Sequence, residues 1–323
     1  PFRQHVADVG EMPFGDLPAA VDQQLRRTAL GQRKLGDPFL GERVVEPVYI
    51  YVSFHFARIL CGKVTIFCNF AARQGNRKRK TSMKTDFLVI GSGAAGLSFA
   101  LKAAAHGHVT IVTKGEMNEC NTNYAQGGIC SVTYAPDTFE KHIHDTLVCG
   151  AGKCDPEAVE LVVRRAPELI RDLIAWGTRF DKTPDGRFEL NREGGHSEHR
   201  ILHHEDLTGA EIERALVESV HKHPNITVLE HHFAIDLLTQ HHLGEFVTRH
   251  TRGLTCFGAY VLNEETNEIE TMLSRFTIVA TGGCGNIYSS TSNPIVATGD
   301  GIAMCHRAKA ITENMEYIQF HPT

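Results

Sequence analysis

A strand–turn–helix–strand segment at residues 86–113 constrains the fold of this 323-residue chain more than any other feature. Residues 86–90, Asp-Phe-Leu-Val-Ile, form the short apolar run that a buried parallel strand requires. Gly-Ser-Gly-Ala-Ala-Gly follows directly at residues 91–96, and the composition predicts a helix from Ala95 to His106 before a second strand at residues 109–113. In this context a G-x-G-x-x-G run lets the backbone approach a pyrophosphate at the positive helix N-terminus. The sequence therefore predicts an α/β dinucleotide-binding domain.

The end of the second predicted strand bears on the choice of dinucleotide. In NAD-dependent domains an acidic residue usually stands there and accepts hydrogen bonds from the ribose hydroxyls. This chain has Thr113 and Lys114 instead, and Glu116 follows two residues later. A lysine offers positive charge to phosphate rather than acceptors to ribose, so a generic NAD-dependent dehydrogenase is disfavoured.

Residues 1–82 differ from the remainder of the chain in charge and in pattern. They carry an excess of Lys and Arg, whereas residues 83–323 are acidic overall. They show neither helical nor strand periodicity, no uncharged apolar run long enough for a transmembrane helix, and no signal-peptide pattern. The basic run at residues 76–80 is interpreted as a solvated linker rather than a nucleic-acid or targeting patch. We expect the domain to begin at Met83, and residues 1–82 to be a dispensable leader or translated upstream sequence.

The composition argues against several classes of protein. Apolar residues make up 42% of the chain and charged residues 22%, both near the globular average. The net charge of −5 gives no general attraction to nucleic acid or to a membrane surface. The nine cysteines include no C-x-x-C pair and the histidine doublets form no H-E-x-x-H motif, so neither a metal site nor a disulfide framework is predicted. Unpaired cysteines indicate a reducing compartment, and we expect a cytoplasmic protein.

Local signals beyond the second strand predict further helices and strands. Asp155 and Pro156 mark the start of one helix, Pro167 should break or kink it, and Gly177 should end it. Thr208-Gly209-Ala210-Glu211 is a capping box that should open a helix to about residue 221. Strands are predicted near residues 226–230, 256–262 and 276–280, and another helix at residues 302–310.

Six separated segments agree in order and spacing with one flavoprotein family. They are Asn123-Tyr124-Ala125-Gln126-Gly127-Gly128, Arg192-Glu193-Gly194-Gly195-His196-Ser197, Arg200-Ile201-Leu202-His203, Ala280-Thr281-Gly282-Gly283, Gly299-Asp300-Gly301-Ile302-Ala303-Met304 and Gln319-Phe320-His321-Pro322-Thr323. On these segments residues 83–323 resemble the L-aspartate oxidases. That family belongs to the flavoprotein group that includes the flavoprotein subunits of succinate dehydrogenase and fumarate reductase. Nothing before Met83 carries the resemblance.

The resemblance implies a fold and a set of domain boundaries. The fold would be a Rossmann-like FAD-binding domain, with a parallel sheet, helices and a small additional β-sheet. Residues 83–312 would form this domain, although incompletely, and residues 313–323 would begin the substrate-capping region. The arginine that moves the substrate proton, a second arginine that clamps a carboxylate and the last flavin-binding segment would belong to parts beyond Thr323, so we expect the chain to be a fragment.

The resemblance also implies FAD, bound noncovalently. The residues that it assigns to the cofactor are Gly91, Ser92, Gly93, Ala94, Ala95 and Gly96 at the pyrophosphate, Lys114 at the adenosine side, Asn121, Thr122, Asn123, Tyr124, Ala125, Gln126, Gly127 and Gly128 along the flavin, and Phe233, Ala234 and Asp300. In the succinate dehydrogenase branch a histidine at the position of Asn121 links covalently to the flavin, a link that asparagine cannot form. Taken from the residues alone, Phe233 is equally an ordinary core residue, and Asp300 a helix N-cap.

Three residues are implied as catalytic or substrate-binding. Succinate dehydrogenases carry an apolar residue and a glutamine where this chain has Glu193 and His196. Aspartate differs from succinate by one α-ammonium group, for which a carboxylate at Glu193 is a charge-assisted partner. His321 and Thr323 would hydrogen-bond a substrate carboxylate.

The activity implied by the resemblance is oxidation of L-aspartate to iminoaspartate. Oxygen would accept the electrons to give hydrogen peroxide, or fumarate would accept them to give succinate, and iminoaspartate would pass to quinolinate synthase in NAD biosynthesis. No nucleic-acid or membrane partner is expected. The alternatives are a soluble fumarate reductase or succinate dehydrogenase flavoprotein, and a flavin-binding remnant without catalysis. Acid release of flavin separates the first from the oxidase, and aspartate-dependent peroxide formation separates an enzyme from a remnant.

Overall fold

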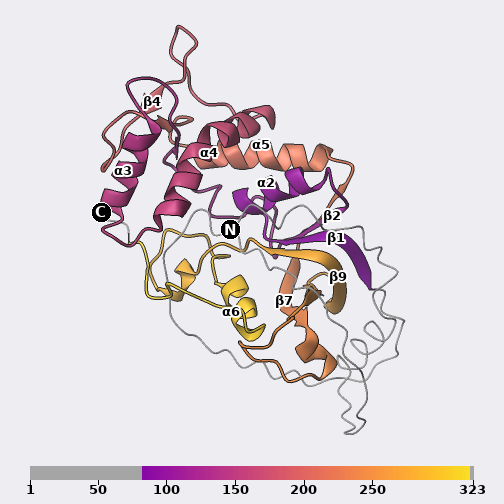
Figure 1. The fold of residues 1–323 in the computed structure, drawn as a ribbon. Helices are drawn as coiled ribbons and strands as arrows, with labels where there is room; N and C mark the ends of the chain where they lie inside the picture. Colours follow the sequence, from indigo (N-terminus) through magenta and orange to yellow (C-terminus); the bar gives the residue numbers. More distant parts are fainter. Residues whose placement is uncertain (1–81, 321–323) are drawn as a thin grey trace.

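The computed structural model describes residues 82–320 (Figure 1). The predicted leader, apart from Ser82, lies outside the described residues, and so do His321 and Thr323. Within the described part, no helix is long and apolar enough to cross a membrane.

A six-stranded mixed sheet forms the centre of the domain, in the strand order β6-β2-β1-β9-β8-β7. The first four strands are parallel, namely β6 (Ile226–Leu229), β2 (Val109–Val112), β1 (Met83–Ile90) and β9 (Glu268–Val279). The last two are antiparallel, namely β8 (Cys256–Asn263) and β7 (His232–Thr239). The predicted strands are all present, but β9 begins eight residues before its predicted start and β7 was not predicted.

The two faces of the parallel strands enter different cores because side chains alternate along a strand. Val89 on β1 belongs to the core that α2 (Ala94–Ala103) and α5 (Thr208–Lys222) cover. Leu88 and Ile90 point the other way, into a core shared with β7, β8 and α6 (Asp300–Arg307). In Figure 1, α2, α4 (Pro156–Ala175) and α5 lie on one side of the sheet and α6 on the other.

A second, three-stranded antiparallel sheet stands beside the main one, in the order β3-β5-β4. Its strands are short, namely β3 (Ile129–Cys130), β5 (Ile201–Leu202) and β4 (Leu190–Asn191). Helix α3 (Phe139–Cys149) and two 3-10 helices, η2 (Gln240–Leu243) and η3 (Gly285–Ile287), complete the described elements. The predicted α/β fold with a small additional β-sheet is therefore confirmed.

The start of α4 agrees with the sequence, but the predicted break within it is wrong. The Asp155 carboxylate accepts hydrogen bonds from the backbone N–H groups of Glu157 and Ala158, as a helix N-cap should. The helix then runs without interruption through Pro167 to Ala175. A proline removes one backbone donor, whereas the burial of Val163, Ile170 and Leu173 along one face stabilises the whole helix.

The predicted capping box at the start of α5 is also wrong. Thr208 is the first helical residue rather than the cap, and its hydroxyl accepts a hydrogen bond from the backbone N–H of His204. The Glu211 carboxylate accepts instead from the backbone N–H of Arg179 and from the Arg214 guanidinium. Both side chains thus form hydrogen bonds with residues outside the predicted capping box, and neither caps the helix.

Two other helices have boundaries that differ from prediction. Helix α2 ends at Ala103, and the chain then turns back, with the His106 N–H donating to the Ala103 carbonyl. Helix α6 begins at Asp300, because Gly299 is the N-cap in the left-handed region, and it ends at Arg307 rather than Ala310. Asp300 therefore follows the cap and is not the cap itself.

Candidate functional site

The G-x-G-x-x-G turn is a place of very close backbone approach. Gly91 has a φ of +108° after β1, and a Cβ atom on it would overlap the Ala280 carbonyl at the end of β9. A Cβ atom on Gly96 would overlap the Gly91 carbonyl. The two glycines therefore allow β1, α2 and β9 to converge, which brings the 280–283 turn to the same place as the dinucleotide turn.

The N-terminus of α2 is open for an anion. Gly93 caps the helix without a side-chain hydrogen bond, and the first turn contains no acidic residue. The Ala94 N–H donates to the Thr122 hydroxyl at 3.1 Å, which ties the 121–128 segment to this helix end. The Ser92 side chain is 3% exposed and points inward, donating to the Met117 carbonyl at 2.7 Å. Backbone groups and the helix dipole, rather than the serine hydroxyl, are therefore available to a pyrophosphate.

The predicted flavin segment, residues 121–128, lies between the starts of α2 and α5. The Gly209 N–H in the first turn of α5 donates to the Ala125 carbonyl at 2.9 Å. A Cβ atom on Gly209 would overlap the Thr122 carbonyl, so only glycine allows this approach. The Asn121 amide nitrogen lies 3.7 Å from the position that a Cβ atom would take on Gly282.

Within this segment most of the predicted contact residues remain accessible. Asn123 is half-buried, and the exposed members are Asn121, Tyr124, Ala125, Gln126, Gly127 and Gly128. The Tyr124 hydroxyl donates to the Glu119 carboxylate at 2.8 Å, a contact that raises the Tyr124 pKa. Hydrogen bonds to the starts of α2 and α5 thus anchor the segment, while most of its residues stay exposed to solvent.

The predicted adenosine-side residues also lie together. The Lys114 ammonium forms an ion pair with Asp300 and donates to the Thr298 hydroxyl at 2.5 Å. The same nitrogen stands 5.9 Å from the centroid of the Phe233 ring. Ala234, the next residue on β7, is buried. Lys114, Phe233 and Asp300 thus come from three separate parts of the chain to one place.

Glu193 lies against the flavin segment, on the loop that joins β4 to β5. Its Oε1 atom is 3.6 Å from the position that a Cβ atom would occupy on Gly127. Burial, and then the charge of Glu193, raise the pKa of the Cys130 thiol on β3 to about 11, which places the carboxylate near β3 as well. The structure therefore brings the predicted substrate carboxylate and the predicted cofactor segment together.

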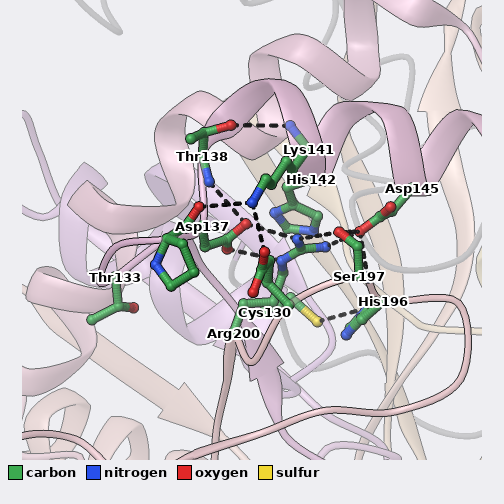
Figure 2. Close-up of polar contacts among 12 residues, drawn as sticks. Cys130, Thr133, Asp137, Thr138, Lys141, His142, Asp145, His196, Ser197 and Arg200 are labelled. Carbon is green, nitrogen blue, oxygen red and sulfur yellow. Dashed lines mark hydrogen bonds and ion pairs between the residues drawn. The ribbon is translucent and has the colours of Figure 1, made fainter.

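Sequence reasoning missed a buried ion-pair network behind this loop, shown in Figure 2. The Arg200 side chain is 0% exposed. Its Nε and Nη2 atoms donate to the two Asp137 oxygens at 2.9 and 2.7 Å, and its Nη1 donates to Asp145 Oδ2 at 2.6 Å. In the sequence, Arg200 stands out only as part of a segment that matches the family. Its place directly before the short apolar strand Ile201–Leu202 is the one local signal of its burial.

The Asp145 carboxyl and the His142 ring each keep one charge state near neutral pH. Burial alone would raise the Asp145 pKa, but hydrogen bonds from Ser197 and Arg200 hold it at about 2. Burial, with the Arg200 charge nearby, lowers the His142 pKa to about 4, so this ring is neutral. One buried cation therefore faces two carboxylates.

A second group that the sequence did not single out is Glu213 on α5. Its side chain is 1% exposed, and burial raises its pKa to about 8. The half-buried Cys120 thiol lies beside it, and desolvation together with the Glu213 charge raises the thiol pKa to about 12. Cys120 also approaches Gly93, with its sulfur 3.9 Å from the position of a Cβ atom there. Cys120 thus lies between the start of α2 and the carboxyl group of Glu213, which can be protonated.

No group of three or more His, Cys, Asp or Glu side chains between residues 82 and 320 is arranged to hold a metal ion. In the same part of the chain, the cysteines form no disulfide.

A strand–glycine turn–helix whose N-cap residue has no capping side chain, faced by an accessible segment at residues 121–128, defines a dinucleotide-binding domain. Comparison with known families agrees, since the family described as FAD binding domain matches residues 86–323. The chain belongs to this family, and its cofactor is FAD. The site fits the group, because the turn excludes side chains, the helix end carries no competing carboxylate and a lysine stands at the predicted adenosine side.

Among characterised proteins, the chain is similar to L-aspartate oxidases. It is 54% identical over 238 residues to L-aspartate oxidase 2-a, chloroplastic, of Nicotiana tabacum, covering 74% of this chain and 36% of that protein. It is 46% identical over 243 residues to L-aspartate oxidase of Vibrio cholerae, covering 74% of this chain and 44% of that protein. The chain thus spans less than half the length of these relatives.

Solved structures with a similar fold include a quinol fumarate reductase chain and a chain named Sdh1. A variant of E. coli quinol fumarate reductase FrdA superposes with a TM-score of 0.63 at 28% identity, covering 69% of this chain and 37% of that one. Mycobacterium smegmatis Sdh1 superposes with a TM-score of 0.62 at 28% identity, covering 70% and 38%. The predicted fold and cofactor are confirmed by these comparisons.

Proposed function

We propose that the full-length protein carrying this chain is an FAD-dependent L-aspartate oxidase. It would convert L-aspartate to iminoaspartate, with oxygen or fumarate as the electron acceptor, and hand the product to quinolinate synthase for NAD biosynthesis. The observation that carries the proposal is the Glu193 carboxylate against Gly127 in the flavin segment. The identity of 44–54% to named L-aspartate oxidases supports it.

The proposed role of Glu193 is to recognise the α-ammonium group of aspartate. An ion pair with hydrogen bonding to a carboxylate is among the stronger polar contacts in proteins. Succinate and fumarate have no ammonium group, so they gain nothing from this contact, and the contact favours aspartate over them. Glu193 would also orient the α-carbon toward the flavin segment, because its carboxylate lies 3.6 Å from the position that a Cβ atom would take on Gly127.

The residues proposed to hold FAD do so mainly through backbone groups. The 91–96 turn and the start of α2 would take the pyrophosphate, Lys114 the adenosine side and residues 121–128 the flavin. When bound, FAD supplies a two-electron acceptor for the hydride of the substrate α-carbon. Asn121 cannot form the covalent link of a histidine at that position, so we propose noncovalent binding.

His321 and Thr323 remain proposals for binding a substrate carboxylate, because both lie outside the described residues. The cationic groups that a dicarboxylate also needs are proposed to come from the rest of the full-length protein. We propose a reducing compartment, which is the cytoplasm or the chloroplast named for the plant relatives.

The test is a paired measurement on the FAD-loaded full-length protein. Glu193→Gln should lower kcat/KM for aspartate oxidation by about 10- to 150-fold, because a charge-assisted contact is lost. Fumarate reduction by the same variant should be nearly unchanged. Glu189→Gln, at an exposed position of the same region, is the matched control and should leave both activities unchanged. Equal losses of both activities in Glu193→Gln would mean that Glu193 supports the loop or the cofactor rather than selecting the substrate.

A soluble fumarate reductase is the second candidate, favoured by the similarity in fold to quinol fumarate reductase. Two measurements on the full-length protein distinguish it. Aspartate-dependent flavin reduction is expected for the oxidase and not for a dedicated fumarate reductase. Acid precipitation should release the flavin, whereas flavin that stays with the precipitate would contradict noncovalent binding and favour the succinate dehydrogenase branch.

A further inference from the structure

Helix α3 holds the Glu193 loop through a row of polar side chains. His142, Asp145 and Cys149 follow one face of the helix at intervals of three and four residues. Asp145 Oδ2 accepts hydrogen bonds from both the backbone N–H and the hydroxyl of Ser197, each at 2.8 Å. The Cys149 thiol reaches the Gly195 carbonyl at 3.8 Å.

The third side chain of the row approaches the same loop. The His142 ring lies edge-on to the His196 ring, with their centroids 6.1 Å apart. His196 Nε2 in turn lies 3.7 Å from the Cys130 sulfur on β3. Every residue of α3 in this row therefore contacts a residue of the loop that carries Glu193.

Arg200 holds the Asp137 and Asp145 carboxylates in place, and Asp145 is one of the α3 residues that contact the loop. It holds Asp137, just before the start of α3, and Asp145, one turn and a half into it, so α3 and the strand that follows the loop form one unit. Its Nη2 atom also reaches the Ser197 hydroxyl at 3.4 Å. Because Arg200 and Asp145 are buried, water does not compete strongly for these contacts.

We propose that Asp145, Arg200 and Ser197 are positioning residues for substrate selection. They fix the conformation of residues 193–197, so that the Glu193 carboxylate stays beside Gly127. None of the three touches the proposed substrate, and each acts through Glu193. The inference rests on the proposed function, because it supposes that Glu193 binds an α-ammonium group. The network would hold the Glu193 carboxylate in the position that this binding requires.

The test uses Ser197→Ala in the FAD-loaded full-length protein. This variant removes one hydroxyl but leaves the Ser197 backbone donor and the Arg200–Asp145 contact in place. We expect kcat/KM for aspartate to fall by about 3- to 10-fold, as for one hydrogen bond to a charged acceptor. Fumarate reduction and FAD content should stay within twofold of wild type, and Ser197→Thr should restore aspartate oxidation. Ser219→Ala is the matched control, because it removes a hydroxyl on α5 that donates to the Trp176 carbonyl and, among the described residues, makes no contact with the 193–197 loop.

A double-mutant comparison separates positioning from general support of the fold. Combined with Glu193→Gln, Ser197→Ala should not change the ratio of aspartate to fumarate activity further, since the group that it positions is gone. Equal losses of both activities, or additive losses in the double variant, would overturn the inference. Unchanged aspartate oxidation in Ser197→Ala beside a loss in Glu193→Gln would overturn it and leave the proposed function standing. A wild-type protein without aspartate-dependent flavin reduction would overturn the proposed function, and this inference with it.

Discussion

Replacement of Glu213 by glutamine should make the stability of the folded domain less dependent on pH. The carboxyl is 1% exposed, and burial raises its pKa to about 8. The unfolded chain titrates near the ordinary value for glutamate, so the folded state keeps a proton that the unfolded state releases. The contribution of the neutral carboxyl to stability is therefore full below the unfolded pKa and is lost as the pH rises through the folded pKa.

The magnitude follows from the one proton involved. Between about pH 5 and pH 8, each pH unit should lower the free energy of unfolding of the wild type by about 1.4 kcal/mol, relative to a variant that cannot ionise there. From pH 5 to pH 7 the difference between Glu213→Gln and wild type should thus shift by about 3 kcal/mol in favour of the variant. The neighbouring Cys120 thiol does not contribute in this range, because its pKa is raised to about 12.

The assay is chemical denaturation of the FAD-loaded full-length protein across this pH range. Comparing the variant with wild type at each pH cancels the groups that titrate equally in both. Glu218→Gln on the same helix is the matched control, because its exposed carboxylate has a pKa lowered by Arg214 and stays ionised throughout. Parallel pH profiles for wild type and Glu213→Gln would refute the reasoning, since Glu213 would then be ionised in the folded state.

The cofactor site supports two further predictions. Gly96→Ala should abolish FAD binding, measured as the ratio of flavin to protein absorbance after purification, because the new methyl group overlaps the Gly91 carbonyl. Gly115→Ala, whose Cβ would meet no atom closer than 3.9 Å, should bind FAD normally, and equal flavin loss in both variants would refute the steric argument. Lys114→Met should weaken FAD binding by about tenfold, measured by flavin fluorescence titration, with a smaller deficit at high salt. An unchanged affinity would show that Asp300 retains the lysine for structural support alone.

The parts of the fold that could be predicted are those that local sequence determines. The β1–α2–β2 unit lies within thirty residues, and its glycine turn is determined by steric exclusion at Gly91 and Gly96. Strand β7 was missed although Phe233 and Ala234 were assigned to the site. Its pairing with β8 shifts register between Ala234 and Asp236, and such a bulge breaks the alternation by which a strand is recognised.

Helix α3 could not be predicted for a different physical reason. Hydrophobic periodicity identifies a helix by the apolar face that it buries. The buried residues of α3 are His142 and Asp145, whose partners are Arg200 and the 193–197 loop, more than fifty residues away. A helix that buries polar groups gives no apolar pattern. The sequence around a histidine or an aspartate does not indicate which distant residue it will contact.

The same polar burial determines what this half of the site can recognise. With the Asp145 pKa at about 2, Arg200 is outnumbered by Asp137 and Asp145, and the network keeps one surplus negative charge behind the loop. Glu193 adds another negative charge on the loop, so Asp137, Asp145 and Glu193 outnumber Arg200 and give this loop a local negative field. Such a field attracts an α-ammonium group and repels a carboxylate. If the proposed function holds, the Glu193 loop and the carboxylates behind it would supply the anionic half of amino-acid recognition in the full-length protein.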